Sequence, residues 1–294
     1  FTKKSMRGSM DLFSPAAIRA IRARYGFHNA KSLGQNFLTD KRVIDAMIGA
    51  AGICPEDLVI EIGPGIGVLT VEAARCAGRV VAIEIDKALI PILKDNLEGV
   101  DNVDIINKDV LRTDINDIIR GSCMRSAKIV GNLPYYITTP IIIKLLSESV
   151  DAESITIMMQ REVAERITAE PGSRTYGALS VAVQYHCKVE TVVDVPKESF
   201  MPAPKVDSRV LKLMPGEKKV VTPVSEDIFF RCVKAGFAQR RKTLLNSLTG
   251  GGFDRETVRD VLAGCGIDAS RRPETLSLRD FADIADGFCA VSEK

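Results

Sequence analysis

The sequence is poor in the residue types that build metal and disulfide sites. It contains two histidines, no tryptophan and no CxxC pair. Its seven cysteines stand singly, at Cys54, Cys76, Cys123, Cys187, Cys232, Cys265 and Cys289. A zinc site needs clustered cysteines and histidines, and a disulfide framework usually has an even number of cysteines. We therefore expect no metal site, no disulfides and no cysteine nucleophile, and we interpret the cysteines as reduced thiols.

Long apolar stretches and a secretory signal are also missing. No apolar run reaches the roughly 18–20 residues that cross a bilayer, and the amino terminus lacks the residue order of a signal peptide. Apolar residues make up 46% of the chain and charged residues 27%, as in soluble globular proteins. We expect a cytoplasmic protein with no membrane partner. The chain opens with Phe1, and we expect residues 1–9 to be partly foreign to the native protein and Met10 to be its start.

The charge is small in total but uneven along the chain. The net charge is +2, yet residues 12–39 and residues 228–252 contain no acid. The basic residues of these two segments are Arg19, Arg22, Arg24, Lys31, Arg231, Lys234, Arg240, Arg241 and Lys242. Each segment alone is equally well explained as a solvated helix face. Together they favour a nucleic-acid partner.

Short β-branched runs alternate with amphipathic helical patterns over most of the chain. The expected strands are 58–62, 80–85, 103–107, 128–130 and 154–158, followed by an antiparallel pair at 189–195 and 209–213. Such alternation predicts an α/β fold with a mostly parallel sheet covered by helices on both faces. From Ser225 onward the periodicity is helical. We expect a basic amino-terminal extension at 1–30, a main domain at 31–215 and a small all-helical domain at 216–294.

A glycine-rich loop follows the first expected strand, in the order Glu61-Ile62-Gly63-Pro64-Gly65-Ile66-Gly67. Glycines allow a sharp turn and let a ligand lie against main-chain N–H groups. The dinucleotide pattern GxGxxG does not fit, because Val68 stands where the third glycine should be. The pattern ExGxGxG is typical of class I methyltransferases, which makes Gly63 and Gly65 candidate cofactor residues. The alternative is a purely structural turn between strand and helix.

Acids stand at the ends of the next two strands. Glu84 ends the second strand, where a carboxylate can accept hydrogen bonds from both hydroxyls of a ribose. Asp86, two residues later, is interpreted as the cap of the following helix. Asp109 follows the third strand and is a candidate acceptor for an adenine amine of the cofactor. Its alternative role is that of a residue stabilising the loop turn.

The segment Asn132-Leu133-Pro134-Tyr135 follows the fourth strand and indicates the chemistry. An exocyclic adenine amine is a poor nucleophile because its lone pair is delocalised into the ring. The side-chain oxygen of Asn132 and the carbonyl of Leu133, directed by Pro134, could each accept one N–H and aim the lone pair at a methyl donor. Tyr135 offers a surface on which a flipped base can stack. Phe200 is a candidate for the opposite face of the base, or an ordinary loop anchor over the core.

With these motifs the chain resembles the KsgA/RsmA family of small-subunit ribosomal RNA adenine dimethyltransferases, from Lys31 to Asp286. The segment Gln35-Asn36-Phe37-Leu38 is similar to the cofactor segment of that family and implies that Asn36 and Leu38 hold S-adenosylmethionine near its methionine end. The resemblance implies cofactor roles for Gly63, Glu84, Asp109 and Asn132, and base contacts for Tyr135 and Phe200. The segment 237–244 is similar to the start of the RNA-binding helical domain.

The resemblance also implies a substrate. Members of this family transfer two methyl groups to each of two adjacent adenines near the 3′ end of 16S ribosomal RNA, within an immature 30S subunit, and we expect this chain to do so as a monomer. The alternatives are a 23S ribosomal RNA methyltransferase of the macrolide-resistance type and a non-catalytic nucleic-acid-binding factor on the same fold. A DNA adenine methyltransferase is a third alternative, although those enzymes more often have proline where Leu133 stands.

Overall fold

The computed structural model describes residues 12–26, 35–216, 219–239 and 241–292. Lys31 and Arg240, expected in the basic segments, lie outside the described residues. The chain divides into two compact units, one made of residues 1–164 and 189–215 and the other of residues 165–188 and 216–294. Within the described ranges, no helix is both long enough and apolar enough to cross a bilayer.

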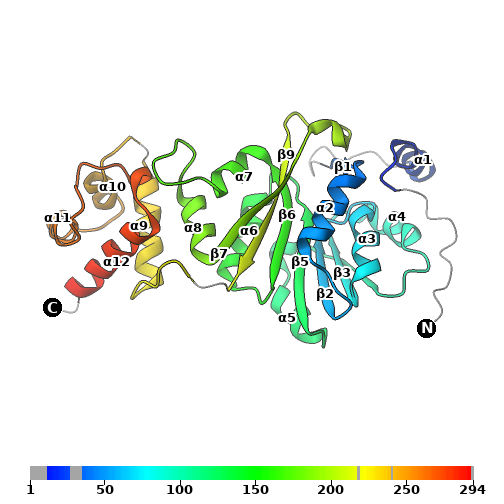
Figure 1. Cartoon of the computed structure of the whole chain (residues 1–294), viewed down its shortest axis with the longest axis horizontal. Helices are drawn as coiled ribbons and strands as arrows, with labels where there is room; N and C mark the ends of the chain where they lie inside the picture. Colours follow the sequence, from blue (N-terminus) through cyan, green and yellow to red (C-terminus); the bar gives the residue numbers. More distant parts are fainter. Residues whose placement is uncertain (1–11, 27–34, 217–218, 240, 293–294) are drawn as a thin grey trace. The chain divides into compact units, whose positions relative to one another are not determined.

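A seven-stranded sheet forms the centre of the first unit (Figure 1). Its strand order is β4-β3-β2-β5-β6-β9-β7. The strands are β2 (Asp57–Ile62), β3 (Arg79–Glu84), β4 (Val103–Asn107), β5 (Ser126–Asn132), β6 (Ser154–Gln160), β7 (Cys187–Val195) and β9 (Ser208–Pro215). Strands β2 to β6 pair in parallel, and β9 runs antiparallel to β6 with Ser208 opposite Gln160. The expected α/β sheet is confirmed.

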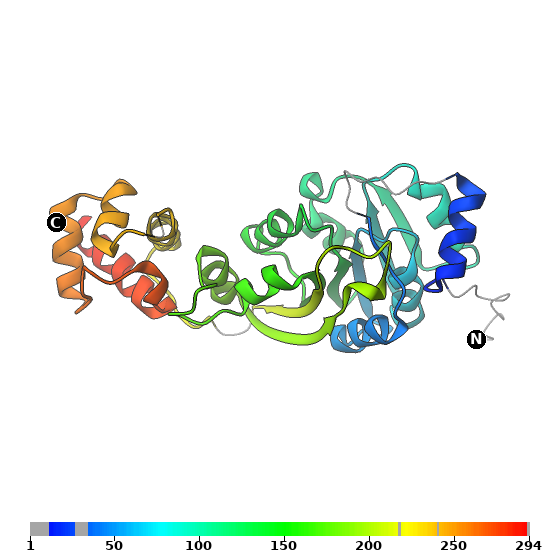
Figure 2. The ribbon, with the colours of Figure 1, turned by 90° about the horizontal axis from the view of Figure 1, so that it is seen from above.

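Helices cover both faces of this sheet, as the uniformly buried strand β2 requires. Helices α2 and α6 lie on opposite faces (Figures 1 and 2). The helical segments of this unit are α1 (Pro15–Tyr25), α2 (Lys41–Ala51), α3 (Val68–Cys76), α4 (Leu89–Asn96), η2 (Val110–Arg112), α5 (Ile115–Gly121), α6 (Thr138–Ser147) and η3 (Lys197–Ser199), with α7 (Arg161–Ile167) crossing into the second unit. Asp40 caps α2 by accepting a hydrogen bond from the Arg42 N–H.

A buried ion pair holds the amino ends of β2 and β5 together. The Lys128 Nζ lies 2.8 Å from the Asp57 carboxylate, and the two side chains are 6% and 1% exposed. Burial opposes ionisation most strongly, but hydrogen bonds from Lys128 and Ser126 lower the pKa of Asp57 to about 2. The Lys128 ammonium also donates to the Gly52 carbonyl. The pair lies near the amino ends of the strands, at the end of the sheet opposite their carboxyl ends.

The second unit is helical. It contains α8 (Ala178–His186), α9 (Glu226–Phe237), α10 (Leu244–Gly250), α11 (Arg255–Gly264), η4 (Pro273–Thr275) and α12 (Leu278–Ser292). The expected division at residue 216 differs from the observed units, because residues 165–188 belong to the helical unit. The reason is apolar packing: Tyr176 and Tyr185 are buried in the helical core, and the Tyr185 ring lies 4.9 Å from that of Phe229, centroid to centroid.

A second, two-stranded sheet joins distant parts of the first unit. Strand β1 (Phe37–Leu38) pairs antiparallel with β8 (Phe200–Met201), so that Leu38 lies opposite Phe200. The Thr39 N–H extends this pairing by donating to the Ser199 carbonyl over 2.8 Å. The segment that resembles a cofactor site is thereby fixed beside the segment that carries Phe200.

Candidate active site

A large cavity opens at the carboxyl ends of strands β2, β3, β4 and β5. The cavity is open to solvent. Every candidate site residue from the sequence lines it: Asn36, Leu38, Gly63, Gly65, Glu84, Asp109, Asn132, Leu133, Pro134, Tyr135 and Phe200. The carboxyl ends of parallel strands are where α/β folds bind ligands, because the loops leaving neighbouring strands converge there.

The glycine loop forms one wall of the cavity. Gly65 has a φ of +61°, and a Cβ added to it would lie 3.3 Å from Cε1 of Phe37. Gly67 has a φ of +92°, and an added Cβ would lie 2.8 Å from Cδ1 of Leu93. Both positions therefore need glycine, for backbone conformation and for space. Gly63 and Gly65 line the cavity without side chains, so a ligand can approach their backbone closely.

Glu84 is held in a fixed orientation at the end of β3. Its two carboxylate oxygens accept hydrogen bonds from the N–H groups of Gly65, at 3.1 Å, and Asp86, at 2.9 Å. Burial raises the pKa of Glu84, while these two backbone N–H groups act to lower it. A carboxylate has room for further donors on each oxygen, so Glu84 can still bind hydroxyl groups of a ligand.

The prediction that Asp86 caps helix α4 is wrong: the capping position is Ala88, which has no side-chain cap, and Asp86 instead closes the turn ahead of the helix. One carboxylate oxygen accepts from the Ala88 N–H over 2.9 Å, just ahead of helix α4. The other accepts from Nε2 of Gln35 over 2.7 Å. Asp86 thus ties the segment containing Asn36 to the carboxyl end of β3.

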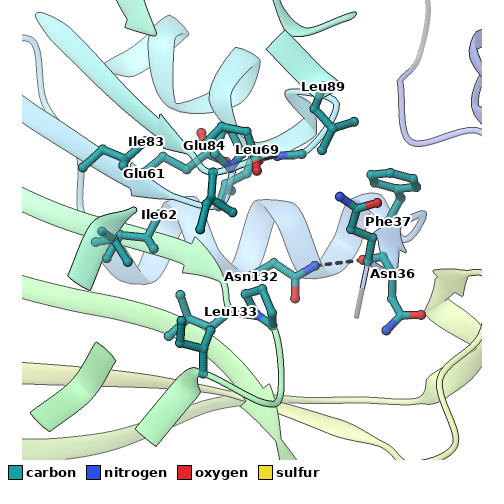
Figure 3. A pocket seen from close by; sticks show the side chains of 18 of the residues that line it. Asn36, Phe37, Glu61, Ile62, Leu69, Ile83, Glu84, Leu89, Asn132 and Leu133 are labelled. Carbon is teal, nitrogen blue, oxygen red and sulfur yellow. Dashed lines mark hydrogen bonds between the residues drawn. The ribbon is translucent and has the colours of Figure 1, made fainter. Parts of the chain in front are cut away.

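Glu61 was not singled out from the sequence. Its side chain is 1% exposed, lines the cavity and lies close to Glu84 (Figure 3). Burial, with a smaller contribution from the Glu84 carboxylate, raises the pKa of Glu61 to about 8. Among the described residues, Oε2 of Glu61 has no hydrogen-bond partner. The signal in the sequence was an acid inside an otherwise apolar strand, directly before the glycine loop.

Asp109 and Tyr136 stand on the same side of the cavity. Asp109 accepts from the Leu111 N–H over 2.9 Å at the start of η2, so it has the turn role that was its alternative interpretation, and it lines the cavity as well. Tyr136, also missed from the sequence, lines the cavity with 53% of its surface exposed. Partial burial, together with the Asp109 and Glu84 carboxylates, raises the pKa of Tyr136. Its only signal was its position directly after Tyr135.

The Asn132 amide has its orientation set by a hydrogen bond across the cavity. Its Nδ2 donates to the Asn36 carbonyl over 3.1 Å (Figure 3), which leaves Oδ1 as the free acceptor. The Leu133 N–H donates to the Met158 carbonyl over 3.1 Å, while the Pro134 carbonyl accepts from Ile137 and Thr138. Within the part of the chain that the structure describes, no donor reaches Oδ1 of Asn132 or the Leu133 carbonyl.

Two aromatic side chains complete the cavity on the side of β9. Tyr135 is half-buried, and its hydroxyl lies 2.7 Å from the hydroxyl of Ser208. Phe200 is buried and belongs both to the hydrophobic core and to the cavity lining. Its side chain therefore has the anchoring role that was the alternative interpretation, and it also lines the same cavity as Tyr135.

Comparison with known proteins agrees with this geometry. The model of the family described as "Ribosomal RNA adenine dimethylase" matches residues 26–287. A protein of Clostridioides difficile named "Ribosomal RNA small subunit methyltransferase A" is 48% identical over 277 residues, 94% of this chain and 96% of the relative. A protein of the same name from Geobacillus thermodenitrificans is 46% identical over 284 residues, 95% of this chain and 97% of the relative.

Two solved structures are also similar. A dimethyladenosine transferase from Plasmodium falciparum has a TM-score of 0.71 and 30% identity, covering 84% of this chain and 95% of that one. The 23S rRNA methyltransferase ErmE has a TM-score of 0.67 and 26% identity, covering 86% and 99%. Since the family model and these relatives span nearly the whole sequence, this chain belongs to the ribosomal RNA adenine dimethylase family.

Proposed function

We propose that this chain transfers methyl groups from S-adenosylmethionine to the exocyclic amine of adenines in small-subunit ribosomal RNA. The observation that carries the proposal is the pair of free acceptors, Oδ1 of Asn132 and the Leu133 carbonyl, in one cavity with Glu84 and the glycine loop. An amine with two N–H donors needs two acceptors, and the ribose hydroxyls of a nucleoside cofactor need a carboxylate such as that of Glu84.

The cavity residues fit S-adenosylmethionine chemically. Glu84 would bind the ribose hydroxyls, since both its oxygens retain acceptor capacity beside the Gly65 and Asp86 N–H groups. Asp109 would accept from the adenine amine. Asn36 and Leu38 would hold the methionine end, as the family resemblance implies. Bound there, the cofactor supplies an electrophilic methyl group on a sulfonium.

The residues around Asn132 act by positioning. Two acceptors that hold the two N–H groups of the target adenine draw its nitrogen toward tetrahedral geometry and direct its lone pair. The proton can leave after the nitrogen becomes positively charged, so the chain needs electrostatic stabilisation more than a strong general base. Tyr135 and Phe200 would stack on the flipped base, each contact being worth about 1–3 kcal/mol against a few kcal/mol of unstacking.

The choice of RNA follows from the degree of similarity. The relatives at 46–48% identity are named for the small subunit, whereas the 23S enzyme ErmE is 26% identical. We propose that the target is two adjacent adenines near the 3′ end of 16S ribosomal RNA in an immature 30S particle, and that the protein acts as a monomer in the cytoplasm. The intact Asn132 to Tyr135 segment and Glu84 argue against a purely structural RNA-binding factor.

The experiment uses the full chain with isotopically labelled S-adenosylmethionine and two substrates, under-modified 30S particles and protein-free 23S RNA. We expect label only in the 30S particles, at two neighbouring adenosines that mass spectrometry identifies as dimethylated. The Asn132→Ala variant serves as the matched control and should transfer label about 10²–10³-fold more slowly. Label in 23S RNA alone would establish the macrolide-resistance type of enzyme instead, and no label in either RNA would overturn the methyltransferase proposal.

A further inference from the structure

The phenol of Tyr135 is tied to a strand that does not adjoin its own. Tyr135 follows β5, and its partner Ser208 is the first residue of β9, two strands away in the sheet. The hydroxyls lie 2.7 Å apart, and Ser208 is fully buried. The backbone of Ser208 is itself fixed, because it stands opposite Gln160 in the antiparallel pairing of β9 with β6. The ring of Tyr135 is thus anchored at its far end as well as at its backbone.

The residue before Ser208 anchors the other aromatic segment. The side chain of Asp207 accepts a hydrogen bond from the Lys197 N–H over 3.1 Å, which closes the loop that carries Phe200. The Asp207 carbonyl accepts from the Arg161 N–H over 3.0 Å, which fixes this closure to the end of β6. Ser208 therefore holds the Tyr135 ring through its hydroxyl, and the neighbouring Asp207 holds the loop that carries Phe200 through its bond to Lys197.

This arrangement is not a general property of buried serines in the protein. Ser154 and Ser247 are also buried, and among the described residues their hydroxyls have no partner. The fold therefore tolerates a buried serine hydroxyl without a hydrogen bond. The bond of Ser208 has a side chain of the cavity lining as its partner, and it restrains the Tyr135 ring, which with a free hydroxyl could tilt about its two side-chain torsions.

We infer that Ser208 is a positioning residue for the target base, which holds the Tyr135 ring at a fixed angle while Asp207 holds the Phe200 loop. This inference rests on the proposed function, because it assigns the part of the cavity that Tyr135 and Phe200 line to the flipped adenine. A ring held in place offers its stacking face without losing further conformational freedom when the base enters, and stacking then aligns the amine with the acceptors at Asn132 and Leu133.

A double-mutant cycle tests the inference. The variants are Ser208→Ala, Tyr135→Phe and both together, with Ser154→Ala as the matched control that removes a buried hydroxyl from β6. For each full-length protein, kcat and KM are measured on under-modified 30S particles, together with the KM for S-adenosylmethionine and the Tm. Loss of one hydrogen bond corresponds to a roughly threefold to tenfold lower kcat. We expect this loss in either single variant and no further loss in the double variant.

The expected pattern separates positioning from simple stability. The KM for S-adenosylmethionine should not change, and Ser154→Ala should match the wild-type kcat. Normal kcat in Tyr135→Phe or Ser208→Ala, or multiplied losses in the double variant, would overturn the inference while leaving the proposed function intact. If Ser208→Ala fails to fold, Tyr135→Phe alone tests the inference, because it removes the same hydrogen bond by changing the half-buried partner. If the wild-type protein does not methylate the particles, the proposed function falls and the inference falls with it.

Discussion

Replacing Glu61 by glutamine should change how the stability of the protein depends on pH. Glu61 is almost completely buried beside Glu84, and its pKa is raised to about 8 from an ordinary value of 4.5. Glutamine has nearly the same shape as a protonated glutamic acid and does not titrate. The variant therefore removes the cost of ionising a buried acid and keeps the packing of β2.

The sign and size of the effect follow from proton linkage. Below a pH of about 4.5 Glu61 is protonated in both the folded and the unfolded chain, so it contributes no pH dependence. Between about 4.5 and 8 the unfolded chain releases the proton while the folded protein keeps it, so the free energy of unfolding falls as pH rises. At roughly 1.4 kcal/mol per pKa unit, the loss reaches at most about 5 kcal/mol above the folded-state pKa.

Thermal unfolding measured from pH 5 to pH 9 checks this prediction. The Tm of Glu61→Gln should be close to that of the wild type near pH 5 and exceed it by up to about 10–20 °C at pH 9, since 1 kcal/mol shifts Tm by about 2–4 °C in domains of this size. The matched control is Glu98→Gln, because Glu98 is exposed and its substitution should leave the pH profile unchanged. Parallel pH profiles for Glu61→Gln and the wild type would refute the assignment of Glu61 as a buried neutral acid.

Three further predictions concern catalysis, RNA binding and stability. Asn132→Ala should lower kcat by about 10²–10³-fold with RNA affinity nearly unchanged, as measured by methyl transfer and filter binding, because it removes a preorganised acceptor; unaltered turnover would exclude Asn132 from the reaction. Replacing Arg240 and Arg241 with alanine should weaken RNA binding and reduce the slope of log K against log salt concentration by roughly 0.7–0.9 per lost phosphate contact. An unchanged slope in a salt titration would mean that these arginines belong to an ordinary solvated surface. Lys128→Met should destabilise the protein by about 3–5 kcal/mol in urea unfolding, because the Asp57 carboxylate stays buried without its partner; a loss below about 1 kcal/mol would mean that water reaches Asp57.

The sheet and the wall of the cavity could be predicted from the sequence because both depend on local signals. Runs of β-branched residues mark the strands, and the residues directly after each run must meet at one edge of a parallel sheet. Glu84, Asp109 and Asn132 were found in this way, each at the end of a different strand. Glycine at positions 63 and 65 carried its own signal, because a loop of that composition has few structural uses.

The parts that escaped prediction depend on long-range contacts. Strands β1 and β8 are two residues each, too short to show any periodicity, and they pair across the chain. Ser208 lies 73 residues from Tyr135 in the sequence, so their bond becomes visible only with the strand order known. Residues 165–188 join the helical unit because the rings of Tyr176 and Tyr185 enter its core, and no pattern in that segment identifies the core it packs into.

The short sheet of β1 and β8 has a thermodynamic consequence for the two ligands. It binds the backbone around Leu38 to the backbone around Phe200. The Thr39 hydroxyl also donates to the Ser199 carbonyl, and the Ser199 hydroxyl donates to the Asp40 carboxylate. A molecule that displaces one of these strands also displaces the other, because their backbones are hydrogen-bonded to each other. Thermodynamic linkage makes this coupling reciprocal. If the methyl donor increases the affinity for RNA by some factor, RNA increases the affinity for the donor by the same factor.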